Sequence, residues 1–193
     1  MSSYFKGPVE VIHMGRTGAA AAADALDGAA GVTCFDTKGL RMTNTSHGWI
    51  AGSTLEIGGT TNYNGMRYLR AVAANYMYFN VDTFVAETFT TSDYVYPWIK
   101  LKRGTAWKLL QFEMHLSAAS ATSEDLTLDM DADKGSYYDT NLYTKDMNGV
   151  TDILWIPGEG KGVIFMPDDR LKLAWANSNT KNWGAKFIIQ TEK

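Results

Sequence analysis

The sequence predicts an all-β protein, in which a small antiparallel β meander or barrel-like module is followed by an antiparallel β-sandwich. A jelly roll is one topology that fits this sandwich. Three observations predict the class: short runs of alternating apolar and polar residues, turn signals between the runs, and no alternation of strands with long helices. In the 193-residue chain, we expect an N-terminal strand and alanine-rich arm over 1–31, the small module over 32–92 and the sandwich over 93–193.

The N-terminal segment begins with a candidate strand at 9–14 and continues into the alanine-rich stretch 18–31. This stretch contains eight alanines and three glycines, but Leu26 is its only large apolar residue. Such a composition can bury little surface against its own domain, so it gains little to offset the entropy lost on ordering. We therefore expect an arm that is mobile in the isolated protein and becomes ordered against a neighbouring subunit.

The small module is predicted from three alternating runs, at 54–57, 66–71 and 76–81. The connector 58–65 reads Gly-Gly-Thr-Thr-Asn-Tyr-Asn-Gly, and its residues accept a positive φ or bond their own backbone, so it is predicted to be a turn. Ala74-Asn75 supplies the next reversal. The three strands should form an antiparallel meander.

The C-terminal half shows the same pattern more strongly. Apolar side chains occupy every second position over 110–116, 126–132 and 171–176, and further strands are expected near 153–157, 163–166 and 183–191. The preceding stretch 91–98 is predicted to be a linker, because Pro97 lacks the backbone N–H that a sheet ladder needs.

Composition and charge exclude several classes of protein. The net charge of −3 argues against a general nucleic-acid binder, and the single cysteine, Cys34, excludes an intramolecular disulfide framework. No apolar run approaches the roughly 20 residues of a membrane helix, so no membrane insertion is expected. The N-terminus also lacks a secretory signal pattern, so we expect synthesis in a cytosol without export through such a signal.

The strongest metal-binding pattern is Asp129, Asp131 and Asp133, whose spacing matches the first half of a calcium loop. However, the twelfth position of that loop would be Thr140, where a bidentate Glu is needed. The strict alternation of 126–132 instead predicts that these aspartates lie on the solvent face of a strand that ends at Gly135. We therefore expect no metal site.

Catalytic and cofactor-binding motifs are not found. The three histidines lie far apart, and the chain has neither a Gly-x-Ser-x-Gly elbow nor a phosphate-binding loop. We predict a protein that is not an enzyme and that needs no cofactor.

The surplus of six tryptophans and ten tyrosines is more informative. Trp107, Trp155 and Trp175 fall within alternating runs, which predicts core positions. Other aromatic residues lie beside turns and are candidates for contact with a subunit or a glycan, because exposed aromatic rings suit both; these are Trp49, Trp98, Trp183, Tyr137, Tyr138 and Tyr143.

Two stretches carry a resemblance to a known family. Residues 55–69, Leu-Glu-Ile-Gly-Gly-Thr-Thr-Asn-Tyr-Asn-Gly-Met-Arg-Tyr-Leu, together with the later Phe-Val-Ala-Glu at 84–87, resemble a small β module common in structural proteins of tailed bacteriophages. The C-terminal half, with its patterns at 146–152 and 169–177, is similar to β-sandwich virion proteins.

This resemblance implies a non-enzymatic structural component of a tailed-phage virion, which decorates the capsid or attaches to the tail or neck. It also implies contacts with other virion proteins and with copies of itself, after synthesis in the host cytoplasm. The alternative is a carbohydrate-binding β-sandwich that stacks Trp and Tyr rings on sugars, and a host-surface glycan fits both hypotheses. A hydrolase with its acids in loops is a third reading, which no motif supports.

Overall fold

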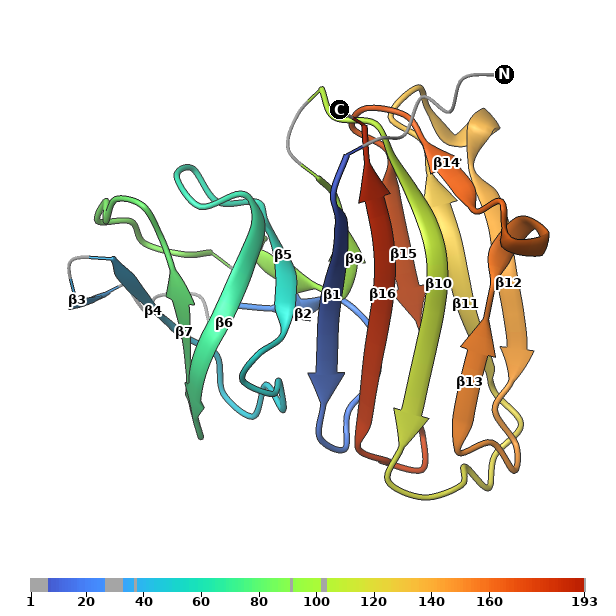
Figure 1. The fold of residues 1–193 in the computed structure, drawn as a ribbon. Coiled ribbons are helices and arrows are strands. Elements are labelled where there is room, and N and C mark those ends of the chain that lie inside the picture. The colour runs from blue at the N-terminus through green and yellow to red at the C-terminus, as the bar shows by residue number, and fades with distance from the viewer. Residues whose placement is uncertain (1–6, 27–32, 37, 91, 102–103, 193) are drawn as a thin grey trace.

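A computed structural model describes residues 7–26, 33–36, 38–90, 92–101 and 104–192 (Figure 1). The predicted all-β class is confirmed, since 52% of the structure is strand and 4% is helical. Its only helical elements among the described residues are two 3-10 turns, η1 (Ser136–Tyr138) and η2 (Pro157–Gly160). In the described part of the chain, no helix is long and apolar enough to cross a membrane.

The larger lobe consists of two antiparallel sheets. The first has the order β1-β16-β10-β13, and β14 pairs with β10 beside β13; its strands are β1 (Val9–Arg16), β10 (Trp107–Leu116), β13 (Asp152–Trp155), β14 (Val163–Phe165) and β16 (Trp183–Thr191). The second has the order β12-β11-β15-β9; its strands are β9 (Trp98–Ile99), β11 (Asp125–Asp131), β12 (Thr140–Asp146) and β15 (Arg170–Ala174).

The order of these strands is that of a jelly roll. β13 and β14 pair with successive parts of β10 and can be counted as one interrupted strand. In chain order, the resulting eight strands then have the positions 1-8-3-6 in one sheet and 2-7-4-5 in the other. This arrangement contains the two Greek keys of a jelly roll, so the expected sandwich is present with that topology.

The smaller lobe is a curled seven-stranded sheet with the order β2-β8-β5-β6-β7-β4-β3. Its strands are β2 (Asp24–Ala25), β3 (Thr33–Asp36), β4 (Gly39–Thr43), β5 (Thr54–Gly58), β6 (Gly65–Ala73), β7 (Tyr76–Asn80) and β8 (Tyr94–Tyr96). The meander β5-β6-β7 forms as predicted. In the chain, this whole lobe lies between the first two strands of the jelly roll, β1 and β9, and we call it the inserted module.

The N-terminal segment is part of the fold over the described residues 7–26, which corrects the expectation of a mobile arm. β1 pairs with β16 along its whole length. Ala21 and Trp175 exchange backbone hydrogen bonds of 2.9 and 3.1 Å, and both Ala21 and Leu26 are buried. Small side chains therefore bring this segment close to its own domain. Residues 27–31 of the expected arm lie outside the described residues.

The stretch 91–98 is also not a linker in its described part. Residues 94–96 form β8 against β5 of the inserted module, and residues 98–99 form β9 against β15 of the jelly roll. Pro97 lies between the two strands, where its missing N–H interrupts no ladder.

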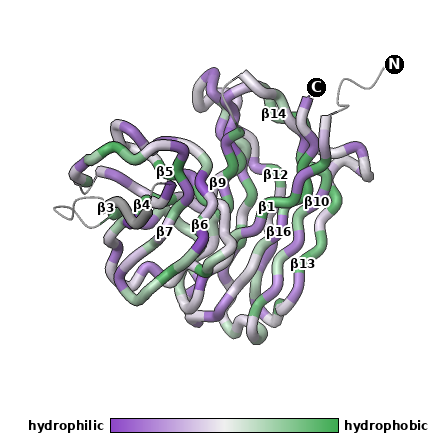
Figure 2. The backbone as a smooth tube through the Cα atoms, turned by 60° about the vertical axis from the view of Figure 1, so that its left-hand side comes forward, coloured by the Kyte–Doolittle hydropathy of each residue, from purple (hydrophilic) through white to green (hydrophobic). Residues whose placement is uncertain are grey.

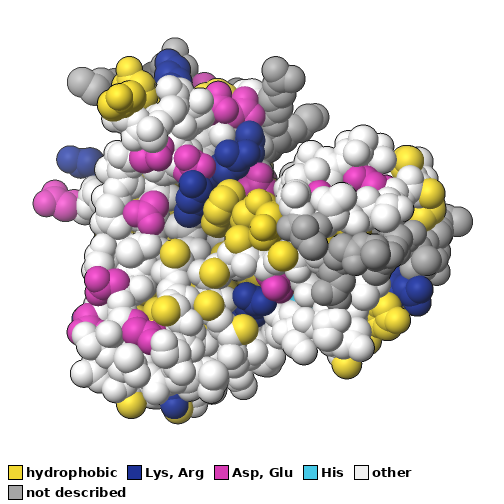
Figure 3. Space-filling view, turned by 180° about the vertical axis from the view of Figure 1, so that it is seen from behind, with side chains coloured by type: hydrophobic (Ala, Val, Ile, Leu, Met, Phe, Trp, Pro, Cys, Tyr) yellow, Lys and Arg dark blue, Asp and Glu magenta, His cyan; other side chains and the backbone are white. Residues whose placement is uncertain are grey.

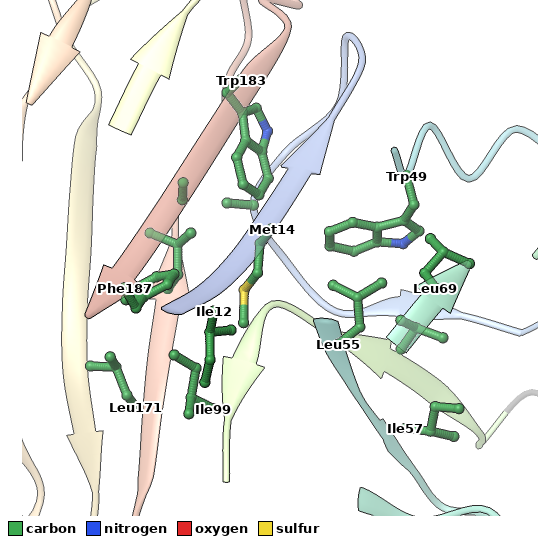
Figure 4. Close-up of a cluster of buried hydrophobic side chains, with 14 of the residues drawn as sticks. Ile12, Met14, Trp49, Leu55, Ile57, Leu69, Ile99, Leu171, Trp183 and Phe187 are labelled. Atoms are coloured by element: carbon green, nitrogen blue, oxygen red, sulfur yellow. The ribbon is translucent and has the colours of Figure 1, made fainter. Parts of the chain in front are cut away.

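One hydrophobic core extends through both lobes. Hydrophobic and hydrophilic residues are interleaved along the strands (Figure 2), as the period of two requires. Near the boundary of the lobes, Met14 of β1, Trp183 of β16 and Trp49 of the inserted module point toward one another (Figure 4). The Trp49 and Trp183 rings meet edge to face, with centroids 6.2 Å apart.

Candidate functional site

Hydrogen bonds join the segment 61–63 to the segment 85–87 within the inserted module. The carboxylate of Glu87 accepts hydrogen bonds from the backbone N–H groups of Thr61 and Asn62, at 2.5 and 3.0 Å. The buried Tyr63 bonds through its hydroxyl to the backbone of Val85, and the backbone N–H of Val85 donates to that hydroxyl at 2.7 Å. The two parts of the motif, residues 55–69 and 84–87, are therefore joined by hydrogen bonds, which connect two loops of the inserted module.

A strip of three aromatic side chains crosses the junction of the two lobes. Val95 and Ile99 are buried, so the alternating Tyr94, Tyr96 and Trp98 project outward. Because these residues belong to β8 and β9, the strip spans the inserted module and the jelly roll. Seen from behind, hydrophobic and charged side chains gather where the lobes meet (Figure 3).

The rings of this strip are stacked on one another. The ring centroids are 5.6 Å apart for Tyr94 and Tyr96, and 4.0 Å apart for Tyr96 and Trp98, which are inclined by 23°. The Lys172 ammonium lies 4.7 Å from the Trp98 ring centroid. Tyr96 and Lys172 therefore both contact the partly exposed Trp98 ring.

A chain of charges continues from Lys172 across the junction. Lys172 pairs with Asp131 at 2.8 Å, Asp131 lies 3.6 Å from Arg170, and Arg170 reaches Glu56 of the inserted module at 3.3 Å. The Glu56 side chain is only 7% exposed. Burial raises the pKa of Glu56, and the nearby Arg170 lowers this pKa in part. Its Oε2 has no hydrogen-bond partner among the described residues.

A cleft of about 850 Å³ opens beside this charge chain, between β5 and β6 on one side and residues near the start of β15 on the other. Lys100 and Asp168 form an ion pair of 3.4 Å in its wall. Of these ion pairs, Glu56–Arg170 links the inserted module to the jelly roll, whereas Lys100–Asp168 joins two residues next to jelly-roll strands.

The three predicted aspartates do not converge. Asp129 accepts hydrogen bonds from Thr127 and Asn141, both at 2.8 Å, and Asp131 pairs with the cations of β15. β11 ends at Asp131, so Asp133 lies beyond the strand on which it was expected. No group of three or more His, Cys, Asp and Glu that could hold a metal is found among the residues that the structure describes.

Two of the predicted contact residues are in the core, which is a correction. Trp49 and Trp183 are each 2% exposed. Their indole N–H groups donate inside the protein, from Trp49 to Asp24 at 3.0 Å and from Trp183 to the Ala19 carbonyl at 2.9 Å. Their positions beside turns suggested exposure. Each ring is instead covered by the opposite lobe and by the N-terminal segment.

The predicted tyrosines differ from one another. Tyr143 is half-buried, with ring centroids 5.0 Å from Trp155 and 6.4 Å from Phe112. Tyr137 and Tyr138 lie in η1, and Tyr137 is 99% exposed. Tyr137 and Tyr138 therefore have the most exposed rings among the predicted contact residues.

A surface that sequence reasoning missed is the outward side of the five-stranded sheet, which we call the outer face. Six large apolar side chains on or directly after its strands are 49–63% exposed: Val9, Val11, Leu154, Ile156, Ile164 and Met166. They alternate with inward residues such as Ile12 and Phe165. The signal was hidden because β1, β13 and β14 have apolar residues at both inward and outward positions, so their pattern does not show which side is covered.

The centre of the outer face is polar. Lys186 and Glu113 are neighbours across β16 and β10 and form an ion pair of 2.5 Å. His115 and Asp152 lie 2.7 Å apart on β10 and β13. Hydrogen bonds from Lys186 and His115 lower the pKa values of Glu113 and Asp152, respectively. These side chains surround a shallow hollow of about 670 Å³ over Gly184, which has no side chain to fill it.

Comparisons of this chain with protein-family models, with curated proteins and with solved structures found no match.

Proposed function

We propose that this chain is a non-enzymatic structural component of a tailed-phage virion, which decorates the capsid or attaches to the tail or neck through contacts between subunits. The single observation that supports this most is the outer face, where six large apolar side chains remain exposed within the described part of the chain. Large apolar side chains that gather on one side of a sheet are suited to cover by a partner, because their contact with water is unfavourable.

Two further features fit the proposal. The motif at 55–69 and 84–87, which resembles a phage structural module, forms hydrogen bonds between its two parts within the inserted module. The jelly roll is an architecture of viral capsid domains as well as of lectins, so the fold fits the proposal by analogy.

The proposal predicts that this chain is a stoichiometric component of the particles of the phage whose genome encodes it. Mass spectrometry of particles purified through a density gradient should detect the chain in many copies, at a fixed ratio to the major capsid protein. The matched control is the soluble fraction of the same lysate. Detection in that fraction alone would contradict a role in the virion.

A further inference from the structure

We propose that the outer face binds the same face of a second copy of this chain across a twofold axis. This inference depends on the proposed function, because it names the partner in one of the expected subunit contacts. It rests on three properties of the face: the positions of its apolar residues, the balance of its charges and its area.

The exposed apolar residues form two margins with a polar centre between them. Val9 and Val11 lie on β1 at one side of the sheet, and the remaining four belong to β13 and β14 at the other side. With a twofold axis along the strands, the two margins exchange places and the polar centre lies over its copy. Val9 is level with Ile164 across the sheet, so Val9 and Val11 of each copy lie over the apolar margin of the other.

The charges of the centre are balanced in a way that suits a copy of itself. Lys186 and Glu113 stand side by side, and each side chain is 34% exposed. Asp152 and Lys108 add one further charge of each sign on the same outward side of the sheet. A second copy can therefore present a carboxylate where the first presents an ammonium, whereas a polyanion such as nucleic acid would need a basic excess.

The area of the face is sufficient for a specific but moderate interface. Four strand columns with the usual spacing and the length of β16 give roughly 600 Å² of flat surface per copy. Standard interfaces bury about 800 Å² per partner. We therefore expect a reversible dimer, whose population depends on concentration.

Charge reversal on the face gives a sharp test. In sedimentation velocity, the native full-length chain should sediment as a dimer at high concentration. Lys186→Glu makes the centre acidic and Glu113→Lys makes it basic, so each variant alone should be monomeric because like charges face each other. An equimolar mixture should recover the dimer, more strongly at low salt, because the acidic and basic faces are complementary. Lys145→Glu, on the exposed edge strand β12, is the matched control and should remain dimeric.

Leu154→Asp provides a second route that does not involve the ion pair. Leu154 is among the most exposed of the apolar side chains, so this variant should fold normally and lose self-association. The inference is wrong if the native chain is monomeric at every concentration, if the variants still form dimers, or if the mixed variants do not associate. These results concern the isolated protein, so they are separate from the detection of the chain in virions, which tests the proposed function.

Discussion

Buried charges are concentrated where the inserted module meets the jelly roll. Arg16 and Asp24 form an ion pair of 2.6 Å, and Glu56 reaches Arg170 across the junction. Burial is the largest cause of the raised pKa values of Asp24 and Glu56 and of the lowered pKa of Arg16. Desolvation therefore opposes the ionic form of both carboxylates, so these buried ion pairs are not in themselves evidence of a large stabilisation.

Replacement of Glu56 by glutamine should stabilise the protein at neutral pH. Because its folded-state pKa is raised, Glu56 favours folding most below the ordinary glutamate pKa, and this contribution is lost as the pH rises through the raised pKa. Glu56→Gln is uncharged at all pH values and can still accept from Arg170. We expect a melting temperature higher by roughly 2–4 °C at pH 7, corresponding to about 1 kcal/mol, with the difference shrinking toward pH ~4.

Thermal unfolding followed by circular dichroism at several pH values would measure this difference. The exposed Glu10→Gln is the matched control and should change little at any pH. A lower melting temperature of Glu56→Gln at pH 7 would mean that the ion pair with Arg170 outweighs desolvation.

At the scale of elements, β1 is a structural strand of the jelly roll despite its position at the start of the chain. Ile12 and Met14 point into the core between the sheets, and Val9 and Val11 point to the outer face. Neighbouring residues of the same strand, with similar chemistry, therefore have different roles. One face contributes to stability and the other is available to a partner.

Alanine substitutions at adjacent positions of β1 should separate these roles. Ile12→Ala leaves a cavity and should cost about 2–5 kcal/mol of unfolding free energy, whereas Val11→Ala should stay within about 0.5 kcal/mol. Urea unfolding monitored by tryptophan fluorescence gives both values. If Ile12→Ala had as little effect as Val11→Ala, β1 would be a detachable arm, as the sequence alone suggested.

At the scale of the whole molecule, the two lobes share one core. Trp49 of the inserted module contacts Trp183 of β16, and the Arg16 guanidinium lies 4.4 Å from the Trp49 ring centroid. The inserted module lies between β1 and β9 in the chain. The jelly roll is therefore completed only by strands that follow the module in the sequence.

This shared core predicts a single cooperative unfolding transition. Tryptophan fluorescence and far-ultraviolet circular dichroism should give coincident melting curves, and Trp49→Ala should lower both by the same number of degrees. The expected destabilisation is about 3–5 kcal/mol, because a large buried ring is removed. Two separate transitions, only one of which shifts in Trp49→Ala, would show that the lobes unfold independently.

The sequence by itself determined the all-β class, the meander β5-β6-β7 and the positions of most jelly-roll strands. These features depend on a period of two and on local turn chemistry, which are visible within ten residues of the chain. The solvent-facing position of Asp129 and Asp131 was predictable for the same reason. A strand pattern does not, however, identify the neighbours of the strand.

Only the tertiary structure decided that β1 pairs with β16, that β8 and β9 join the two lobes, and that Trp49 and Trp183 are buried. The outer face was decided in the same way. Alternation shows which residues share a side of a strand, but whether that side is covered depends on segments up to about 180 positions away in the chain. Burial and exposure here are consequences of these distant pairings, because hydrogen bonds between strands and the contacts of the common core form only when the whole chain has folded.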